Sequence, residues 1–207
     1  MKKYIIEFIG TFFLILTIAF TGNPIAIGAV LVALVYMGGY ISGAHYNPAV
    51  TVAMWVNKKI TIDTAAYYIV TQILAGIVAS GVYFFVQNKM FLPEPAQGVN
   101  GIAALVIEIL FTFLLASVVL HTAATEKTKG NQYFGLAIGL TVMAGAFVGG
   151  PISGGTFNPA VGISPLLFDI TNIHSHMINI VIYLIGPIVG GILAGLVYKC
   201  ITSVREV

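Results

Sequence analysis

The sequence contains two stretches that nearly repeat each other, ISGAHYNPAV at residues 41–50 and ISGGTFNPAV at residues 152–161. Seven of the ten positions are identical, and the offset is 111 residues. A second echo pairs Glu7-x-x-x-Thr11-Phe12 with Glu108-x-x-x-Thr112-Phe113, at an offset of 101 residues. Repeats at a nearly constant offset indicate a duplicated structural unit.

Each repeat carries the tripeptide Asn-Pro-Ala, at Asn47, Pro48 and Ala49 and again at Asn158, Pro159 and Ala160. Asn is a preferred N-cap residue and Pro suits the first helical turn, so each tripeptide predicts a helix start. The apolar stretches Asn47–Val56 and Asn158–Phe168 are too short to cross a bilayer core of about 30 Å. We therefore expect two re-entrant half-helices.

A helix start inside a membrane has a definite electrostatic effect. It points unpaired N–H groups and about half a positive charge along its axis. Two such starts that meet head to head would repel protons and metal cations, while water or a neutral solute would pass at little cost in free energy. The paired tripeptides therefore favour a path for uncharged molecules.

The composition requires lipid as the main solvent. The chain has 207 residues, of which 58% are hydrophobic and only 8% charged, and its mean hydropathy is +1.00. Soluble domains carry about 25% charged residues. Six long apolar segments are predicted to span the bilayer, at Tyr4–Thr21, Ile25–Ile41, Thr64–Val86, Ile102–Ala124, Tyr133–Val148 and Met177–Ile201. The expected fold is an all-α membrane protein with six transmembrane helices and two re-entrant half-helices.

Each half of the chain then contains three spans, with a half-helix after the second span. We expect a single channel domain over 1–207, with a first repeat at about 1–87 and a second at about 100–204. Because three is odd, the second half enters the membrane upside down, and the two half-helices approach a shared midplane from opposite faces.

The basic residues predict the orientation. Six spans place eight of them on the side of both termini, namely Lys2, Lys3, Lys58, Lys59, Lys127, Lys129, Lys199 and Arg205, and only Lys89 on the other side. Basic residues gather on the cytoplasmic side of membrane proteins, so both termini are expected in the cytoplasm. The short termini and the Met-Lys-Lys start favour a prokaryotic plasma (inner) membrane.

Other function classes receive little support. The formal net charge of +2 and the lack of a basic aromatic patch argue against nucleic acid, and the single Cys200 excludes an intramolecular disulfide or a cysteine metal cluster. No nucleophile–base spacing or nucleotide loop suggests an enzyme, and no cofactor is expected. His174 and His176 lie in an outer loop, where a solvated loop is favoured over a metal site.

The repeats resemble the two signature loops of the aquaporin (major intrinsic protein) family, the first at residues 42–51 and the second at residues 150–160. Supporting matches are Glu7, Gln72, Gly76, Glu108, Gly186, Pro187, Gly190 and Gly191. The resemblance covers essentially the whole chain. It implies a six-helix barrel with one pore per subunit for water and small uncharged solutes, and usually a homotetramer. It also implies that Glu7 and Glu108 brace the loop backbones and that His45 is structural.

The chain departs from the family at its narrowest point. Most aquaporins carry Arg directly after the second tripeptide, where this sequence has Val161. Spacing from the motifs places the other constriction positions at Ile27, Ala146 and Gly155. This set is small, apolar and uncharged, so ammonia, urea, hydrogen peroxide or glycerol could pass. The glycerol channels usually have Asp after the Arg, and here Gly162 stands at that place.

Two rival interpretations remain. An ion-coupled secondary transporter can also use inverted repeats and broken helices, but only Glu7 and Glu108 would supply acids within the spans. A structural membrane protein could use Gly186, Gly190, Gly191 and Gly195 for close helix packing. Packing alone does not explain two matched half-length helices.

Overall fold

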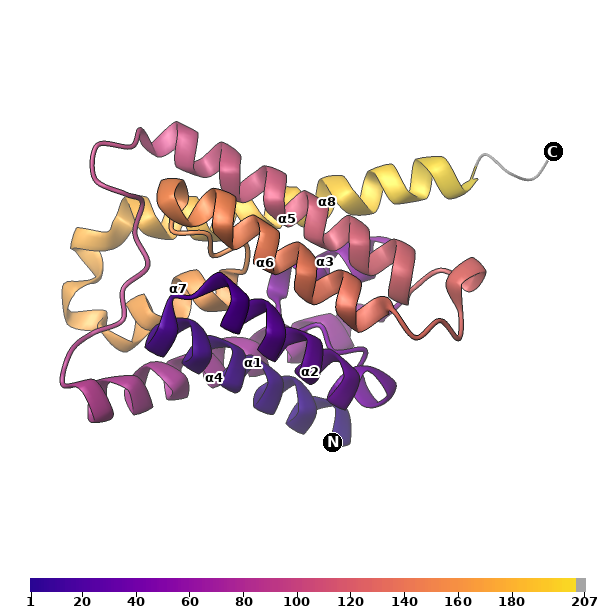
Figure 1. Ribbon diagram of the computed structural model, residues 1–207, viewed down its shortest axis with the longest axis horizontal. Coiled ribbons are helices and arrows are strands. Elements are labelled where there is room, and N and C mark those ends of the chain that lie inside the picture. Colours follow the sequence, from indigo (N-terminus) through magenta and orange to yellow (C-terminus); the bar gives the residue numbers. More distant parts are fainter. Residues whose placement is uncertain (204–207) are drawn as a thin grey trace.

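The computed structural model describes residues 1–203, except for the side chains at positions 175 and 203. In chain order its elements are α1 (Lys2–Thr21), α2 (Pro24–Ser42), α3 (Pro48–Val56), α4 (Ile62–Gln87), α5 (Gly101–Ala123), η1 (Glu126–Thr128), α6 (Phe134–Ser153), α7 (Pro159–Phe168), η2 (Ile170–His176) and α8 (Met177–Ser203). Figure 1 shows them as one bundle. Arg205, which the charge argument used, lies outside the described residues.

Six helices of the described chain are long and apolar enough to cross a membrane, namely α1, α2, α4, α5, α6 and α8. The six predicted spans are therefore confirmed, and the two predicted short helices begin at Pro48 and Pro159. The largest difference lies in the fifth span, which was expected to end at Val148 but continues to Ser153 through Pro151. Pro151 lacks an N–H and its ring crowds the carbonyl group four residues earlier, but it stands two residues before the end of α6, so the disruption is confined to the last turns.

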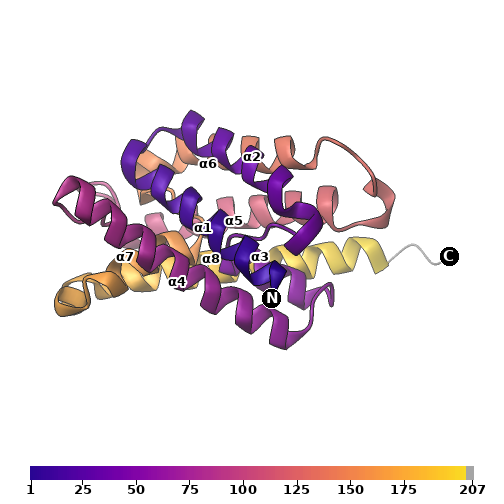
Figure 2. The same cartoon turned by 90° about the horizontal axis from the view of Figure 1, so that it is seen from below.

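Each helix contact in the first half of the chain has a counterpart in the second half. In the first half α1 packs against α2 and α4, and in the second half α5 packs against α6 and α8. Between the halves, α3 packs on α8, α7 packs on α4, and α2 lies against α6. Figures 1 and 2 both place α3 and α7 toward opposite ends of the bundle. This is the arrangement expected of an inverted repeat.

Two glycines allow the short helices to lie close to long ones. A Cβ on Gly191 of α8 would overlap the carbonyl oxygen of Ala49 in α3. A Cβ on Gly76 of α4 would overlap the side chain of Ser164 in α7. Small residues permit such close approach in membrane bundles, where van der Waals packing drives helix association. Each half-helix is thereby held against a full-length helix from the other half of the chain.

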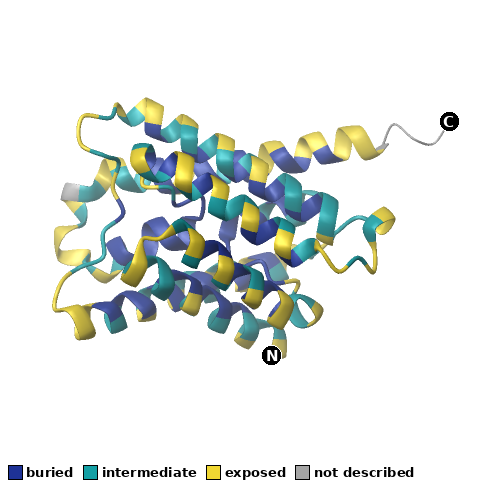
Figure 3. Cartoon of the chain, viewed as in Figure 1, coloured by how far each residue is buried: buried dark blue, intermediate teal, exposed yellow. Residues whose placement is uncertain are grey.

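The outer surface is apolar, as a lipid-facing surface requires. Large hydrophobic side chains are exposed along the long helices, among them Val70 (56%), Phe85 (88%) and Ile178 (71%). Figure 3 shows exposed positions on the outer faces of the bundle and buried positions between the helices. The most polar buried groups lie in the interior, including Glu7 and Glu108, which are both fully buried.

Candidate functional site

Both tripeptides form capped helix starts. The Oδ1 atom of Asn47 accepts a hydrogen bond from the Ala49 N–H at 2.8 Å. The Oδ1 atom of Asn158 accepts one from the Ala160 N–H at 2.9 Å. Pro occupies the first helical position in both cases. The local chemistry predicted from the sequence therefore produces the two helix starts.

The two Asn side chains also tie the loops to each other. Asn47 Nδ2 donates to the Phe157 carbonyl oxygen at 2.8 Å, and Asn158 Nδ2 donates to the Tyr46 carbonyl oxygen at 2.9 Å. Each accepting residue stands directly before the opposite Asn. The sequence analysis missed these reciprocal bonds, because residue spacing within one loop says nothing about carbonyl groups in the other. They bring the two helix starts together at one point.

The carboxylate of Glu7 holds the first loop. Its Oε1 accepts hydrogen bonds from the Ser42 hydroxyl at 2.7 Å and from the His45 backbone N–H at 2.9 Å. Its Oε2 accepts from the Tyr46 backbone N–H at 2.8 Å and from the Gln72 side-chain amide at 2.9 Å. Four donors thus offset the cost of burying this acidic group away from water.

Glu108 makes the equivalent contacts in the second loop. Its Oε1 accepts from the Ser153 hydroxyl at 2.7 Å and from the Thr156 backbone N–H at 3.0 Å. Its Oε2 accepts from the Thr156 hydroxyl at 2.9 Å and from the Phe157 backbone N–H at 2.6 Å. The Thr156 hydroxyl therefore takes the place that the Gln72 amide has in the first half.

These carboxylates hold backbone that would otherwise be unfavourable. Tyr46 has a φ of 50° and Phe157 a φ of 47°, in the left-handed region. Such a conformation costs a non-glycine residue on the order of 1–3 kcal/mol. Both residues donate their backbone N–H to a buried carboxylate. The left-handed turn directs each chain into its Asn N-cap, so the Glu contacts position the helix starts.

A cavity of about 170 Å³ surrounds the meeting point of the loops. Its lining includes Asn47, Asn158 and His45, and also all four expected constriction residues, Ile27, Ala146, Gly155 and Val161. A water molecule takes up about 30 Å³ in the liquid. The cavity therefore has room for several molecules of the size of water.

His45 presents one ring nitrogen to its own loop. Its Nδ1 lies 3.1 Å from the Thr51 hydroxyl oxygen. That hydroxyl donates to the Asn47 carbonyl oxygen at 3.0 Å, so the oxygen must accept from the ring. We infer that Nδ1 carries the proton. The bond fixes the ring at the side of the cavity, in agreement with a structural role for His45.

The sequence analysis missed one further group of lining residues, which comes from the connection between α4 and α5. Phe91 and Pro93 line the same cavity as Val161, and Phe91 packs against the buried cluster that contains Val161. The connection is anchored by the Ala96 N–H, which donates to the Ile152 carbonyl oxygen at 3.1 Å. Nothing in the sequence relates a loop residue to the motif spacing, so no signal could identify Phe91.

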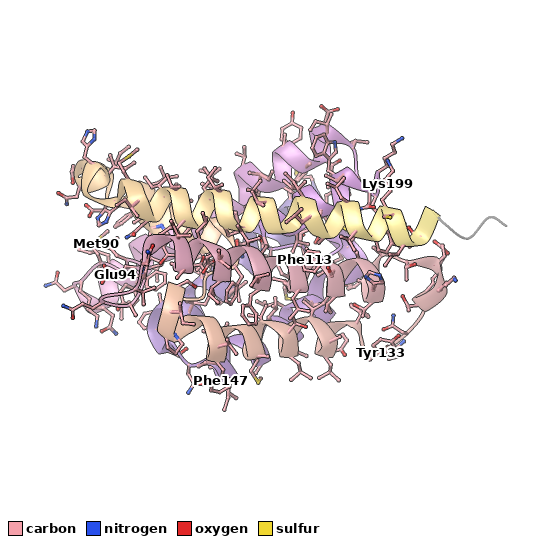
Figure 4. The ribbon with its side chains drawn as sticks, turned by 90° about the horizontal axis from the view of Figure 1, so that it is seen from above. Met90, Glu94, Phe113, Tyr133, Phe147 and Lys199 are labelled. Carbon is pink, nitrogen blue, oxygen red and sulfur yellow. The ribbon has the colours of Figure 1, made fainter. Side chains whose placement is uncertain are left out.

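Figure 4 places this connection in the bundle. Met90 and Glu94, which lie on either side of Phe91 in the sequence, are labelled at the opposite end from Tyr133 and Lys199. The connection between α4 and α5 therefore lies at the end of the bundle away from Tyr133 and Lys199. The described residues contain no group of three side chains that could hold a metal ion. Of the two outer-loop histidines, His176 lies with its Nε2 atom 3.9 Å from Asp169 Oδ2.

The contacts of Glu108 lead to a test of stability. Glu108→Gln replaces one accepting oxygen by an NH₂ group, which leaves two of the four donors facing another donor. Each hydrogen bond to a charged group contributes about 1.5–3 kcal/mol. We expect a clearly lower midpoint of thermal unfolding for the purified protein in detergent. Glu94→Gln, at an exposed position, is the matched control. Equal midpoints for the two variants would contradict a positioning role for Glu108.

The comparisons with known proteins agree with this geometry. Residues 1–198 match the family described as "Major intrinsic protein". Nodulin-26 from Glycine max is 34% identical over 218 residues, which cover 97% of this chain and 78% of that protein. "Glycerol uptake facilitator protein-like 6" from Lactiplantibacillus plantarum is 36% identical over 211 residues, which cover 94% of this chain and 95% of that protein.

The fold also resembles a solved structure. The X-ray structure of the aquaglyceroporin from Plasmodium falciparum aligns with a TM-score of 0.77 at 18% identity, covering 96% of this chain and 97% of that one. At this identity the likeness concerns the fold alone. Taken with the family match and the relatives, it leads to one conclusion: the chain belongs to the major intrinsic protein family, and it is a channel, not an enzyme, through which water and small solutes cross a membrane passively.

Proposed function

We propose that this channel passes water together with small uncharged solutes such as ammonia, urea, hydrogen peroxide and glycerol, and that it excludes protons and ions. The observation that carries the proposal is the pair of reciprocal hydrogen bonds between Asn47 and Asn158 and the opposite loops. These bonds aim two helix starts at one point of the cavity. The ends of α3 and α7 then supply about half a positive charge each.

The proposed selectivity follows from what each Asn can still offer. A side-chain amide has two N–H donors, and one of them is used in the bond to the opposite loop. Since both Asn side chains line the cavity, the second N–H is available to the oxygen of a passing molecule. A neutral molecule exchanges water for these donors at little cost, while a cation meets positive potential without compensating oxygen ligands.

The range of solutes follows from the constriction. Ile27, Ala146, Gly155 and Val161 line the cavity, and none of them carries a charge or a side-chain donor. We propose that this set leaves the passage wider and less polar than an Arg at position 161 would. We propose that Phe91 narrows the passage again, because it lines the same cavity and packs against the buried cluster that contains Val161. The width of the passage is then set in part by an aromatic ring from a loop.

The orientation and assembly belong to the same proposal. Lys58, Lys59, Lys127 and Lys199 line one hollow, and the positive-inside rule places such a group in the cytoplasm, together with both termini. We propose a homotetramer with one pore per subunit, and a prokaryotic plasma membrane as the host. The relatives include plant proteins as well as a bacterial one, and the bacterial relative supports a prokaryotic host.

The first test concerns the missing Arg. Val161→Arg adds bulk and a fixed positive charge to the constriction. We expect urea and ammonia uptake into proteoliposomes to fall about tenfold, equivalent to about 1.4 kcal/mol in the barrier, while water flux is retained. Val161→Ile, which adds one methylene without charge, is the control. Unchanged urea uptake in a Val161→Arg protein that still conducts water would show that position 161 is not in the constriction.

The second test concerns the loop ring. Phe91→Ala removes an aromatic side chain from the lining of the cavity, so the permeability to the largest solutes should rise most. We expect glycerol uptake to rise about tenfold relative to water flux, by the same conversion of barrier to rate. Phe85→Ala is the matched control, since Phe85 is 88% exposed and outside the cavity lining. Equal glycerol uptake by the two variants would remove Phe91 from the constriction.

A further inference from the structure

A second hollow lies apart from the pore cavity and has a different character. Its volume is about 1070 Å³, and its lining includes Lys58, Lys59, Glu126, Lys127, Tyr133 and Lys199. We call it the inner basin. It shares no lining residue with the cavity that holds Asn47 and Asn158. Tyr133 and Lys199 are labelled at the same end of the bundle in Figure 4.

The lysines of the inner basin come from three separate parts of the chain. Lys58 and Lys59 directly follow the half-helix α3, Lys127 belongs to η1, and Lys199 lies near the end of α8. The fold therefore brings together basic side chains up to 141 residues apart, from Lys58 to Lys199. The positive-inside rule requires lysines on one side of the membrane, but it does not require them to line the same hollow.

The acidic side chains do not balance this charge. Glu126 is the acidic residue in the described lining, and its Oε2 lies 3.3 Å from the Nζ of Lys129, outside that lining. Lys58, Lys59 and Lys127 form no ion pair with the described residues. Three lysines without an ion pair therefore line one hollow, and an anion bound there would offset the repulsion between their positive charges.

An alternative explanation for these lysines is that they offset the negative charge at the carboxyl ends of helices. The carboxyl ends of α3, α5 and α8 all reach the inner basin, and each contributes about half a negative charge. The last turn of α5 is already satisfied in part, because Thr128 donates to the His121 carbonyl oxygen at 2.9 Å and Asn131 to that of Thr122 at 2.7 Å. The three lysines carry about 3 positive charges and the three helix ends about 1.5 negative charges, which leaves a surplus of roughly 1.5 positive charges.

We propose that the inner basin binds a phosphate monoester or inorganic phosphate. Such a group carries about −1.5 to −2 charges near neutral pH, which matches the surplus, and lysine binds phosphate well as a point charge. The ligand has two natural sources, a soluble phosphate or the headgroup of a lipid such as phosphatidic acid. A headgroup can reach the inner basin because Ile201, which lines it, is 51% exposed at the end of α8.

The test compares two double variants of equal charge change. Lys59→Gln with Lys127→Gln removes two lysines from the inner basin, and Lys2→Gln with Lys89→Gln removes two from elsewhere. Binding is followed by the rise in the unfolding midpoint of the full chain in neutral detergent. One arm titrates inorganic phosphate against chloride at constant ionic strength. The other titrates phosphatidic acid against phosphatidylglycerol, a phosphodiester.

We expect stabilisation by inorganic phosphate or by phosphatidic acid, with an apparent Kd that rises about tenfold or more in the inner-basin variant and stays unchanged in the control. A response to phosphatidic acid alone identifies a lipid headgroup, and a response to phosphate alone a soluble ligand. No stabilisation by either, equal losses in the two variants, or equal binding of phosphatidylglycerol would each overturn the proposal.

Discussion

The pair of hydrogen bonds between each signature Asn and the carbonyl group of the opposite loop controls the rest of this structure. Non-helical backbone is tolerated at membrane depth only where protein or a water-filled path satisfies it. Here the loops before α3 and α7 satisfy each other through Asn47 and Asn158. The same contact fixes the direction of both helix starts, so the bonds that satisfy the loops also create the point at which we propose that selection occurs.

Two buried carboxylates make this arrangement possible. Burial of a charged group without partners costs several kcal/mol, yet Glu7 and Glu108 each accept four hydrogen bonds. Those bonds include the backbone N–H groups of the two left-handed residues, Tyr46 and Phe157. The duplicated halves use the same device with one change, an amide donor in the first half and the Thr156 hydroxyl in the second.

The fold could be predicted in large part because its signals are local or periodic. Apolar runs gave the six spans, and the cap chemistry of Asn47 and Asn158 gave both short helices. The extension of α6 through Pro151 was missed, because the sequence alone does not say that the chain remains helical after a Gly-Gly-Pro run. The reciprocal Asn bonds and Phe91 could not be predicted, since they depend on how separate loops meet. The sequence analysis counted the lysines of the inner basin by side of the membrane, and only the structure shows that they line the same hollow.

The central claim is that opposed helix starts let neutral molecules pass and stop protons at the same point. It is tested most directly by following vesicle volume by light scattering and internal pH by a trapped dye in the same proteoliposomes. The account predicts osmotic shrinkage many times faster than in empty vesicles, together with a proton leak no larger than theirs. A proton leak that rises in proportion to water flux as more protein is incorporated would contradict it.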